Sequence, residues 1–347
     1  MSVVSFPDAG GDLLTLLQVD GELYPYNGDV GQANEIRASA NAKARPDDII
    51  LCNYPKSDAG GDLLTLLQVD GELYPYNGDV EQANEIRASA NAKARPDDII
   101  LCNYPKSGCH WMWEVIKMIL QGSATTIPDF KENHMIELIT ANAMAVIPSP
   151  RVINTHMKFA QLPRDMIEKR CKIVLILRNP KDVAVSFYHH HIGLVNLYQY
   201  EGKWENYLSL FNNGKVDWGS FYDYVHSWEK TIHENPTHPI HVVYYEDMKA
   251  DSAAEVRRLA NFMGVSLSDD LIEAIAEKCS FQNMVKDKMG LEDEKWRKVW
   301  RDEKPRMYRK GEVGDWKNWF TVAQNEEFDR IYAERMANSK LKFRFTL

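Results

Sequence analysis

Several features are missing from this 347-residue sequence, and each absence narrows the possible functions. The longest apolar runs, such as residues 173–177, are far shorter than the roughly 20 residues that span a bilayer. The first residues, Met1 to Pro7, contain neither a basic segment nor an apolar one, so we expect no signal peptide. We therefore expect a cytoplasmic protein without a membrane partner.

Basic residues are also too few to attract a polyanion. The chain has 41 Lys and Arg against 50 Asp and Glu, a net charge of −9. Such a charge repels nucleic acid, so any anionic ligand must be held by a local cluster of cations. The cysteines show no CxxC pair and no regular spacing, which indicates free thiols in a reducing compartment. They are Cys52, Cys102, Cys109, Cys171 and Cys279.

The N-terminal part contains one segment twice. Residues 8–57 and 58–107 differ only at Gly31 and Glu81. Two copies are too few for a solenoid, so a tandem duplication or a gene-model error explains them better. Only the second copy continues into a complete loop and helix, because the first runs directly into Asp58. We expect a peripheral or poorly packed copy at 1–57 and a single domain at 58–347.

Apolar strands alternate with helical patterns over the rest of the chain. We expect strands at 97–103, 151–156, 172–178 and 241–245, and helices at 111–120, 180–190, 221–233, 253–263 and 325–336. The alternation predicts an α/β fold of three layers, in which helices flank a central parallel sheet.

One loop between a predicted strand and helix suits an anion. It reads Tyr-Pro-Lys-Ser-Gly-Cys-His-Trp over residues 104–111. Gly108 allows the backbone to approach an anion, the helix start offers free N–H groups, and Lys106 adds positive charge. The chain has no Walker A motif, which argues against an ordinary NTPase. Taken alone, this loop could equally be a surface turn.

Four motifs together resemble the cytosolic sulfotransferases. The loop at 104–111 resembles their 5′-phosphosulfate loop, and residues 178–186, Arg-Asn-Pro-Lys-Asp-Val-Ala-Val-Ser, resemble the segment that grips the 3′-phosphate. Tyr-Glu-Asp-Met at 245–248 and Arg-Lys-Gly-x-x-Gly-Asp-Trp-Lys at 309–317 follow in the family's order. The resemblance spans about residues 70–347 and implies a P-loop NTPase-like sulfotransferase fold.

The resemblance implies that 3′-phosphoadenosine 5′-phosphosulfate (PAPS) is the co-substrate and that a small phenol, alcohol, steroid or amine accepts the sulfuryl group. Since sulfuryl transfer develops less charge than phosphoryl transfer, we expect no metal requirement. The implied catalytic residues are His156, Lys106 and Ser186, with Asn154 and His156 at the acceptor. The implied PAPS-binding residues are Lys106, Ser107, Gly108, Cys109, His110, Trp111, Arg178, Ser186, Tyr245, Cys279, Ser280, Phe281, Arg309, Lys310 and Gly311.

The residue types suit this chemistry. PAPS carries two separate anionic groups, and Lys106 suits the first while Arg178, Arg309 and Lys310 suit the second, since arginine binds phosphate through two donors. A neutral imidazole at His156 can take the acceptor's proton near pH 7. The resemblance also implies that Trp111 and Phe281 pack against the adenine ring.

The sequence also departs from the family pattern. Asn154 stands where the family usually has lysine, and Cys109 and His110 replace paired threonines. Because Cys109 is expected at a helix start beside Lys106, we predict a lowered thiol pKa and high reactivity toward alkylating agents. The family's dimer motif is only partly present, with Val299 and Glu303 but without its lysine, so we expect a monomer or weak homodimer.

Other functions remain open at this point. A non-catalytic nucleotide-binding relative, disabled by Asn154 or by the duplication, is one alternative, and an ATP-dependent P-loop kinase is another. The missing Walker A motif disfavours the kinase. The consecutive histidines at 189–191 point in different directions on a helix, so we do not expect them to bind a metal together.

Overall fold

The computed structural model describes residues 91–194, 198, 200–288, 297–298, 300–303 and 307–347, together with the backbone of six N-terminal strands. A parallel sheet of four strands lies at the centre, in the order β10-β9-β7-β8. Its strands are β7 (Ile99–Asn103), β8 (Val152–Thr155), β9 (Lys172–Leu177) and β10 (Ile240–Tyr244). All four predicted strands are confirmed.

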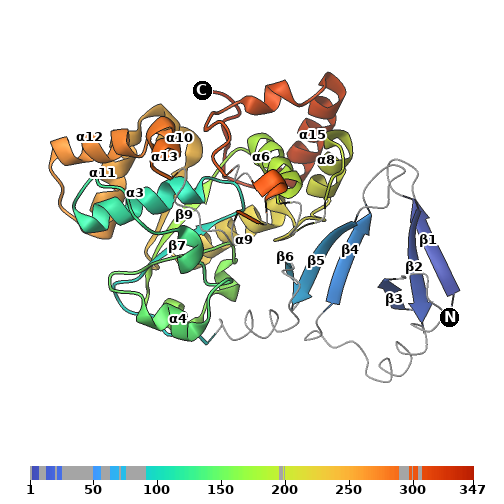
Figure 1. Cartoon of the computed structure of the whole chain (residues 1–347), viewed down its shortest axis with the longest axis horizontal. Coiled ribbons are helices and arrows are strands. Elements are labelled where there is room, and N and C mark those ends of the chain that lie inside the picture. The colour runs from blue at the N-terminus through green and yellow to red at the C-terminus, as the bar shows by residue number, and fades with distance from the viewer. Residues whose placement is uncertain are drawn as a thin grey trace.

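Helices cover both faces of this sheet, as Figure 1 shows. Successive residues of β7 enter different core clusters: Ile100 and Cys102 on one face, Ile99 and Leu101 on the other. Burial on both faces explains why the strands read as continuous apolar runs. The predicted three-layer α/β fold is confirmed.

The helices agree with the predicted segments to within a few residues at each end, and several short helices are additional. The α-helices are α3 (Cys109–Gln121), α4 (Ala141–Val146), α5 (Arg164–Glu168), α6 (Pro180–Gly193), α8 (Trp204–Asn212), α9 (Phe221–Glu234), α10 (Tyr245–Ala250), α11 (Ser252–Met263), α12 (Asp269–Lys278), α13 (Phe281–Lys288) and α15 (Val322–Arg335). The 3-10 helices are η1 (Lys131–His134), η2 (Phe159–Gln161), η3 (Arg301–Glu303) and η4 (Asp315–Asn318).

The N-terminal part, residues 2–103, contributes two antiparallel sheets and one strand of the central sheet, and all these strands except β1 belong to the duplicated segment. The two small sheets are β1 (Ser2–Pro7), β2 (Leu13–Val19) and β3 (Glu22–Pro25), and β4 (Ile50–Pro55), β5 (Leu63–Val69) and β6 (Glu72–Pro75). Because β4 pairs with β5, the second small sheet crosses the expected boundary between residues 57 and 58. The strand of the central sheet, β7, comes from the second copy.

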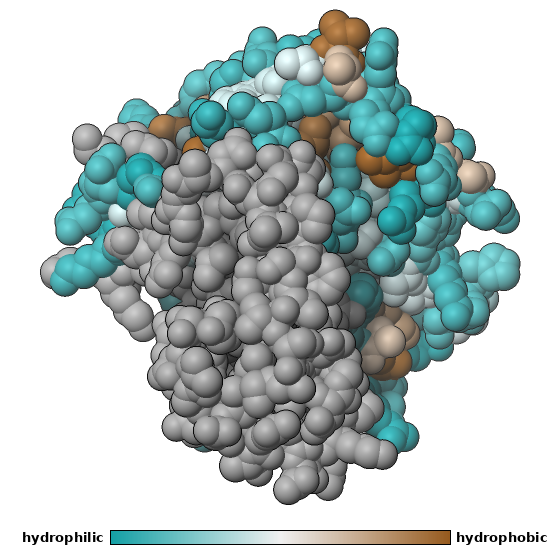
Figure 2. Space-filling model, turned by 90° about the vertical axis from the view of Figure 1, so that its right-hand side faces the viewer, coloured by the Kyte–Doolittle hydropathy of each residue, from teal (hydrophilic) through white to brown (hydrophobic). Residues whose placement is uncertain are grey.

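The surface of the described residues is mainly polar. In the face shown in Figure 2, hydrophilic residues surround small, separate hydrophobic areas. The exposed large hydrophobic side chains are Leu138, Val146, Val322 and Leu347. Among the described residues, no helix is both long enough and apolar enough to cross a membrane.

Candidate functional site

The predicted site residues gather at one edge of the central sheet. The phosphate-binding loop follows β7, His156 follows β8, Arg178 follows β9 and Tyr245 follows β10. Because the strands are parallel, all these positions lie at their carboxyl ends, where α/β proteins bind ligands.

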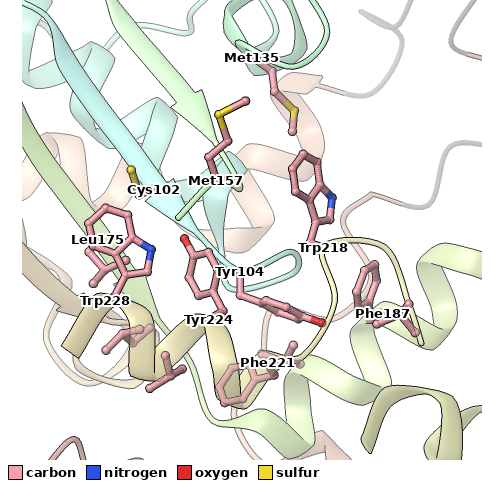
Figure 3. Packing of buried hydrophobic residues seen from close by; sticks show 14 of the residues in the cluster. Cys102, Tyr104, Met135, Met157, Leu175, Phe187, Trp218, Phe221, Tyr224 and Trp228 are labelled. Atoms are coloured by element: carbon pink, nitrogen blue, oxygen red, sulfur yellow. The ribbon is translucent and has the colours of Figure 1, made fainter. Parts of the chain in front are cut away.

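Tyr104 anchors the start of the loop. Its hydroxyl donates a hydrogen bond to the Gly219 carbonyl at 2.7 Å. Its ring meets Phe187, Phe221 and Tyr224 edge-on, within the buried aromatic cluster of Figure 3. The loop therefore leaves the sheet from a fixed point.

The loop turns sharply into α3. Lys106 and Gly108 have positive φ angles of 67° and 110°. A Cβ atom at Gly108 would lie 2.8 Å from the Tyr245 ring, so only glycine fits there. No side chain caps the start of α3, which leaves backbone N–H groups for a ligand, as predicted from the loop. The buried Ser107 hydroxyl likewise has no hydrogen-bond partner among the described residues.

The Lys106 ammonium has only neutral contacts within hydrogen-bonding range among the described residues. Its Nζ lies 3.3 Å from His190 Nδ1 and 3.7 Å from Met307 Sδ. Burial lowers the pKa of Lys106 to about 7, and the cations Lys131 and Arg178 add to that effect. A bound anion would favour the charged ammonium and so raise the pKa again.

Arg178 links the loop to the C-terminal segment. Its Nη1 donates to the Lys106 carbonyl at 2.9 Å and its Nη2 to the Glu312 carbonyl at 3.2 Å. The guanidinium carbon stands 4.1 Å from the centroid of the Tyr245 ring. The buried Nε of Arg178 has no hydrogen-bond partner in the described part of the chain and is free for an anion.

Two carboxylates hold the C-terminal motif in place. The buried Asp182 accepts backbone hydrogen bonds from Gly314 at 2.7 Å and Trp316 at 2.9 Å. Asp315 pairs with Arg309 at 2.6 Å and Lys310 at 2.5 Å. Burial alone would raise the pKa of Asp315, but hydrogen bonds, first from Lys310, lower it to about 2. Both cations are thus positioned by an ionised carboxylate.

His156 is held in one tautomer. Its Nδ1 lies 2.8 Å from the Asn103 carbonyl, which can only accept, so Nδ1 carries the proton and Nε2 keeps its lone pair. The backbone N–H of His156 donates to Glu137 Oε1 at 2.7 Å. Burial lowers the pKa of His156 to about 3, and Lys131 contributes further, so the ring is neutral at pH 7. The edge of Trp218 packs on the ring at 5.1 Å between centroids.

The prediction for Cys109 is wrong. Its thiol is buried beneath the start of α3, and burial raises the pKa of Cys109 to about 12, outweighing the nearby Lys131. The thiol lies 3.8 Å from Asn154 Oδ1. A helix start therefore does not make a thiol reactive when no water reaches it.

The expected adenine-binding residues are found in two separate contacts. The edge of Trp111 meets Tyr245 at 5.4 Å, and a Cβ at Gly311 would overlap the Phe281 ring. Ser280 accepts the first backbone bond of α13 from Met284. The Cys279 thiol instead points into the core, 3.6 Å from Met118 Sδ, so only its backbone is available to a ligand.

The three consecutive histidines have different surroundings. His189 packs on Trp319, His190 contacts Lys106, and the buried His191 lies 2.7 Å from Asp217. They do not converge, as their helical spacing predicts. Ser186 lies one turn earlier on α6. In the described part of the chain, no metal-binding group of His, Cys, Asp or Glu is found.

Several important residues could not be found from the motifs. The buried Glu137 accepts from the Thr155 hydroxyl and the His156 N–H, and burial raises the pKa of Glu137 to about 7. Lys131 and Glu132 form a buried ion pair beside α3. Asp182 and Asp315 lie within recognised motifs, but their roles became visible only in the structure.

Comparisons with known proteins identify the family of this chain. A family described as the sulfotransferase domain matches residues 96–340. Sulfotransferase 1B1 of dog is 39% identical over 251 residues, covering 69% of this chain and 83% of the relative. Sulfotransferase 1A1 of cattle is 35% identical over 251 residues, covering 70% of this chain and 84% of the relative.

Among solved structures, mouse sulfotransferase SULT7A1 complexed with PAP is 34% identical, with a TM-score of 0.63, covering 79% of this chain and 96% of that one. A retinol dehydratase in complex with androsterone and PAP is 19% identical, with a TM-score of 0.62, covering 86% of this chain and 92% of that one, and it shares the fold. The chain belongs to the cytosolic sulfotransferase family, whose members are PAPS-dependent enzymes.

Proposed function

We propose that this enzyme transfers a sulfuryl group from PAPS to a hydroxyl or amine of a small acceptor, such as a phenol, an alcohol or a steroid-like molecule. The observation that carries the proposal is the tautomer of His156, which leaves Nε2 as a base beside the phosphate-binding loop. The apolar Trp218 against the same ring supports an acceptor of apolar character.

The proposed step is a single in-line displacement. The acceptor oxygen or nitrogen attacks sulfur and its proton passes to His156 Nε2. The bond between sulfur and the bridging phosphate oxygen breaks, and its electron pair remains on that oxygen. Lys106 neutralises the charge that develops there. The products are the sulfated acceptor and 3′-phosphoadenosine 5′-phosphate (PAP).

The proposed PAPS contacts follow the described geometry. The free amides of α3 and the Ser107 hydroxyl face the 5′-phosphosulfate, and Arg178, Arg309 and Lys310 bind the 3′-phosphate. Ser186 lies on α6, and we propose that it binds the 3′-phosphate together with Arg178. We propose no metal requirement, a cytoplasmic location, and a monomer or weak homodimer.

A transfer assay tests the proposal. Purified enzyme is incubated with [35S]PAPS and a panel of phenols, alcohols, sterols and amines, with the His156→Ala variant as control. We expect labelled product with at least one acceptor, and its loss in the variant. PAP binding without any labelled product across the panel would favour the non-catalytic alternative.

A further inference from the structure

An ion pair between a buried lysine and a half-buried glutamate lies beside the phosphate-binding loop, outside every motif of the sequence. Lys131 is 6% exposed, and its Nζ lies 3.1 Å from Glu132 Oε1. The same oxygen accepts a hydrogen bond from His110 Nε2 at 2.9 Å. The ammonium is therefore linked through Glu132 to the side chain of His110, a residue in the first turn of α3.

Asn154 holds the backbone of Lys131 in place. Its Nδ2 donates to the Lys131 carbonyl at 2.6 Å, and its own carbonyl accepts from the Ile136 N–H at 3.1 Å. Asn154 is part of β8, which ends one residue before His156. The backbone of η1 is thus tied both to the loop that binds the phosphosulfate and to the strand that carries the base.

The charge of Lys131 reaches both reacting groups. Burial disfavours its ammonium form, but Glu132, Cys109 and Glu137 together outweigh burial, and the pKa of Lys131 is raised. After burial, Lys131 is the largest charge effect that lowers the pKa of Lys106 and of His156. At Lys106 the Glu132 carboxylate offsets part of this effect, whereas at His156 Lys131 is the leading charge.

We propose that Lys131 supplies positive charge to the sulfuryl-transfer centre, and that Glu132 and Asn154 hold it there. This inference rests on the proposed function. When the bond from sulfur to the bridging oxygen breaks, negative charge grows on the phosphate side, and a fixed cation in a dry site stabilises it without rearrangement. Lys131 acts through its field and transfers no proton.

The test compares Lys131→Met with Lys131→Arg and with the exposed control Lys215→Met, using [35S]PAPS and an accepted phenol. We expect Lys131→Met to lower kcat about 10- to 100-fold, while Lys131→Arg and Lys215→Met stay near wild type. Adding Asn154→Lys to Lys131→Met should restore much of the loss, because it returns a cation to the adjoining position.

A pH profile separates an electrostatic role from a structural one. In Lys131→Met, the pKa of Lys106 should rise, because Lys106 loses a neighbouring cation while Glu132 loses its partner. The basic limb of the kcat/KM profile should therefore move to higher pH by about one pH unit. A side chain that only fills space would leave the limb unchanged.

Two outcomes would overturn the inference. The first is a kcat of Lys131→Met within about threefold of wild type, with the basic limb of kcat/KM at the same pH. The second is an equal loss of kcat in Lys131→Met and Lys131→Arg that Asn154→Lys does not restore. If Lys131→Met does not fold, Lys131→Met combined with Glu132→Gln leaves no unpaired buried carboxylate, and the same criteria apply to its kcat. A wild-type enzyme without any transfer would instead refute the proposed function.

Discussion

The last strand of the duplicated segment has the same residues in both copies but a different structure in each, whereas the strands before it match, β2 with β5 and β3 with β6. Ile50–Pro55 forms β4 and pairs antiparallel with β5, whereas the equivalent residues of the second copy belong to β7 and the loop after it. In the central sheet, β7 lies between β9 and β8 in parallel pairing. An identical strand therefore takes its structure from the partners that it can reach, because strand preference depends strongly on context.

The residues that come after each copy explain the difference. The second copy continues through Gly108 into α3, whose apolar face packs under the sheet. The first copy continues into Asp58, which puts a carboxylate where the loop requires a glycine. The second copy provides the Asn103 carbonyl for His156 and the Lys106 carbonyl for Arg178.

The sharpest test of this comparison replaces the equivalent lysine of each copy by alanine. Lys106→Ala should lower kcat/KM by about 10³-fold, because the charge on the leaving phosphate oxygen is no longer neutralised. Lys56→Ala should leave kcat/KM unchanged; Lys56 lies outside the described residues. Steady-state kinetics with [35S]PAPS measures both. A comparable loss in the two variants would show that the first copy also takes part in the site.

The second test removes the base that the Asn103 carbonyl orients. His156→Ala should lower kcat by at least about 10²-fold, since proton removal is lost. PAP affinity, measured by calorimetry, should remain near that of wild type. His233→Ala on α9 is the matched control. Turnover close to normal in His156→Ala would remove this residue from the mechanism.

The third test concerns the cation that the Lys106 carbonyl positions. Arg178→Ala or Lys310→Ala should weaken PAP by about 1.5–3 kcal/mol, the scale of a hydrogen bond to a charged group. The binding of adenosine 5′-phosphosulfate, which lacks the 3′-phosphate, should weaken much less. Calorimetric titration of each variant with both nucleotides decides the matter, and equal losses would refute the assignment to the 3′-phosphate.

The fourth test uses the pKa of Lys106. Because burial lowers this pKa to about 7, the ammonium of the free enzyme is present below that pH and is lost as pH rises through it. The kcat/KM profile should therefore show a basic limb near pH 7. Lys106→Arg, which stays charged, should remove the limb while retaining measurable transfer. An unchanged limb in Lys106→Arg would assign it to another group.

The sequence predicted the sheet and the site edge well because both depend on local patterns. Apolar runs such as residues 173–177 identify buried strands, and the motifs that end them supply Lys106, Arg178 and Tyr245. Contacts between distant segments could not be predicted. Asp182 bonds to Gly314, and η1 lies against Asn154, only because the sheet order brings them together. The prediction of a lowered pKa for the Cys109 thiol failed for the same reason, because the thiol is buried against Asn154 of β8, which is distant in sequence.

The smallest expected effect comes from removing the first copy. A chain that begins at residue 58 lacks β4, the partner of β5, but retains β7, the loop and α3. Among the residues whose side chains the structure describes, the central core begins at Ala92, and we expect the shortened enzyme to keep the melting temperature, PAP affinity and kcat of the full chain. Starting at residue 91 sharpens the test, because it removes β5 and β6 as well. If the chain that begins at residue 58 unfolds or loses PAP binding, the first copy belongs to the folded enzyme, and the difference between the copies is one of position rather than of importance. If only the chain that begins at residue 91 does so, the folded enzyme needs residues 58–90 of the second copy instead.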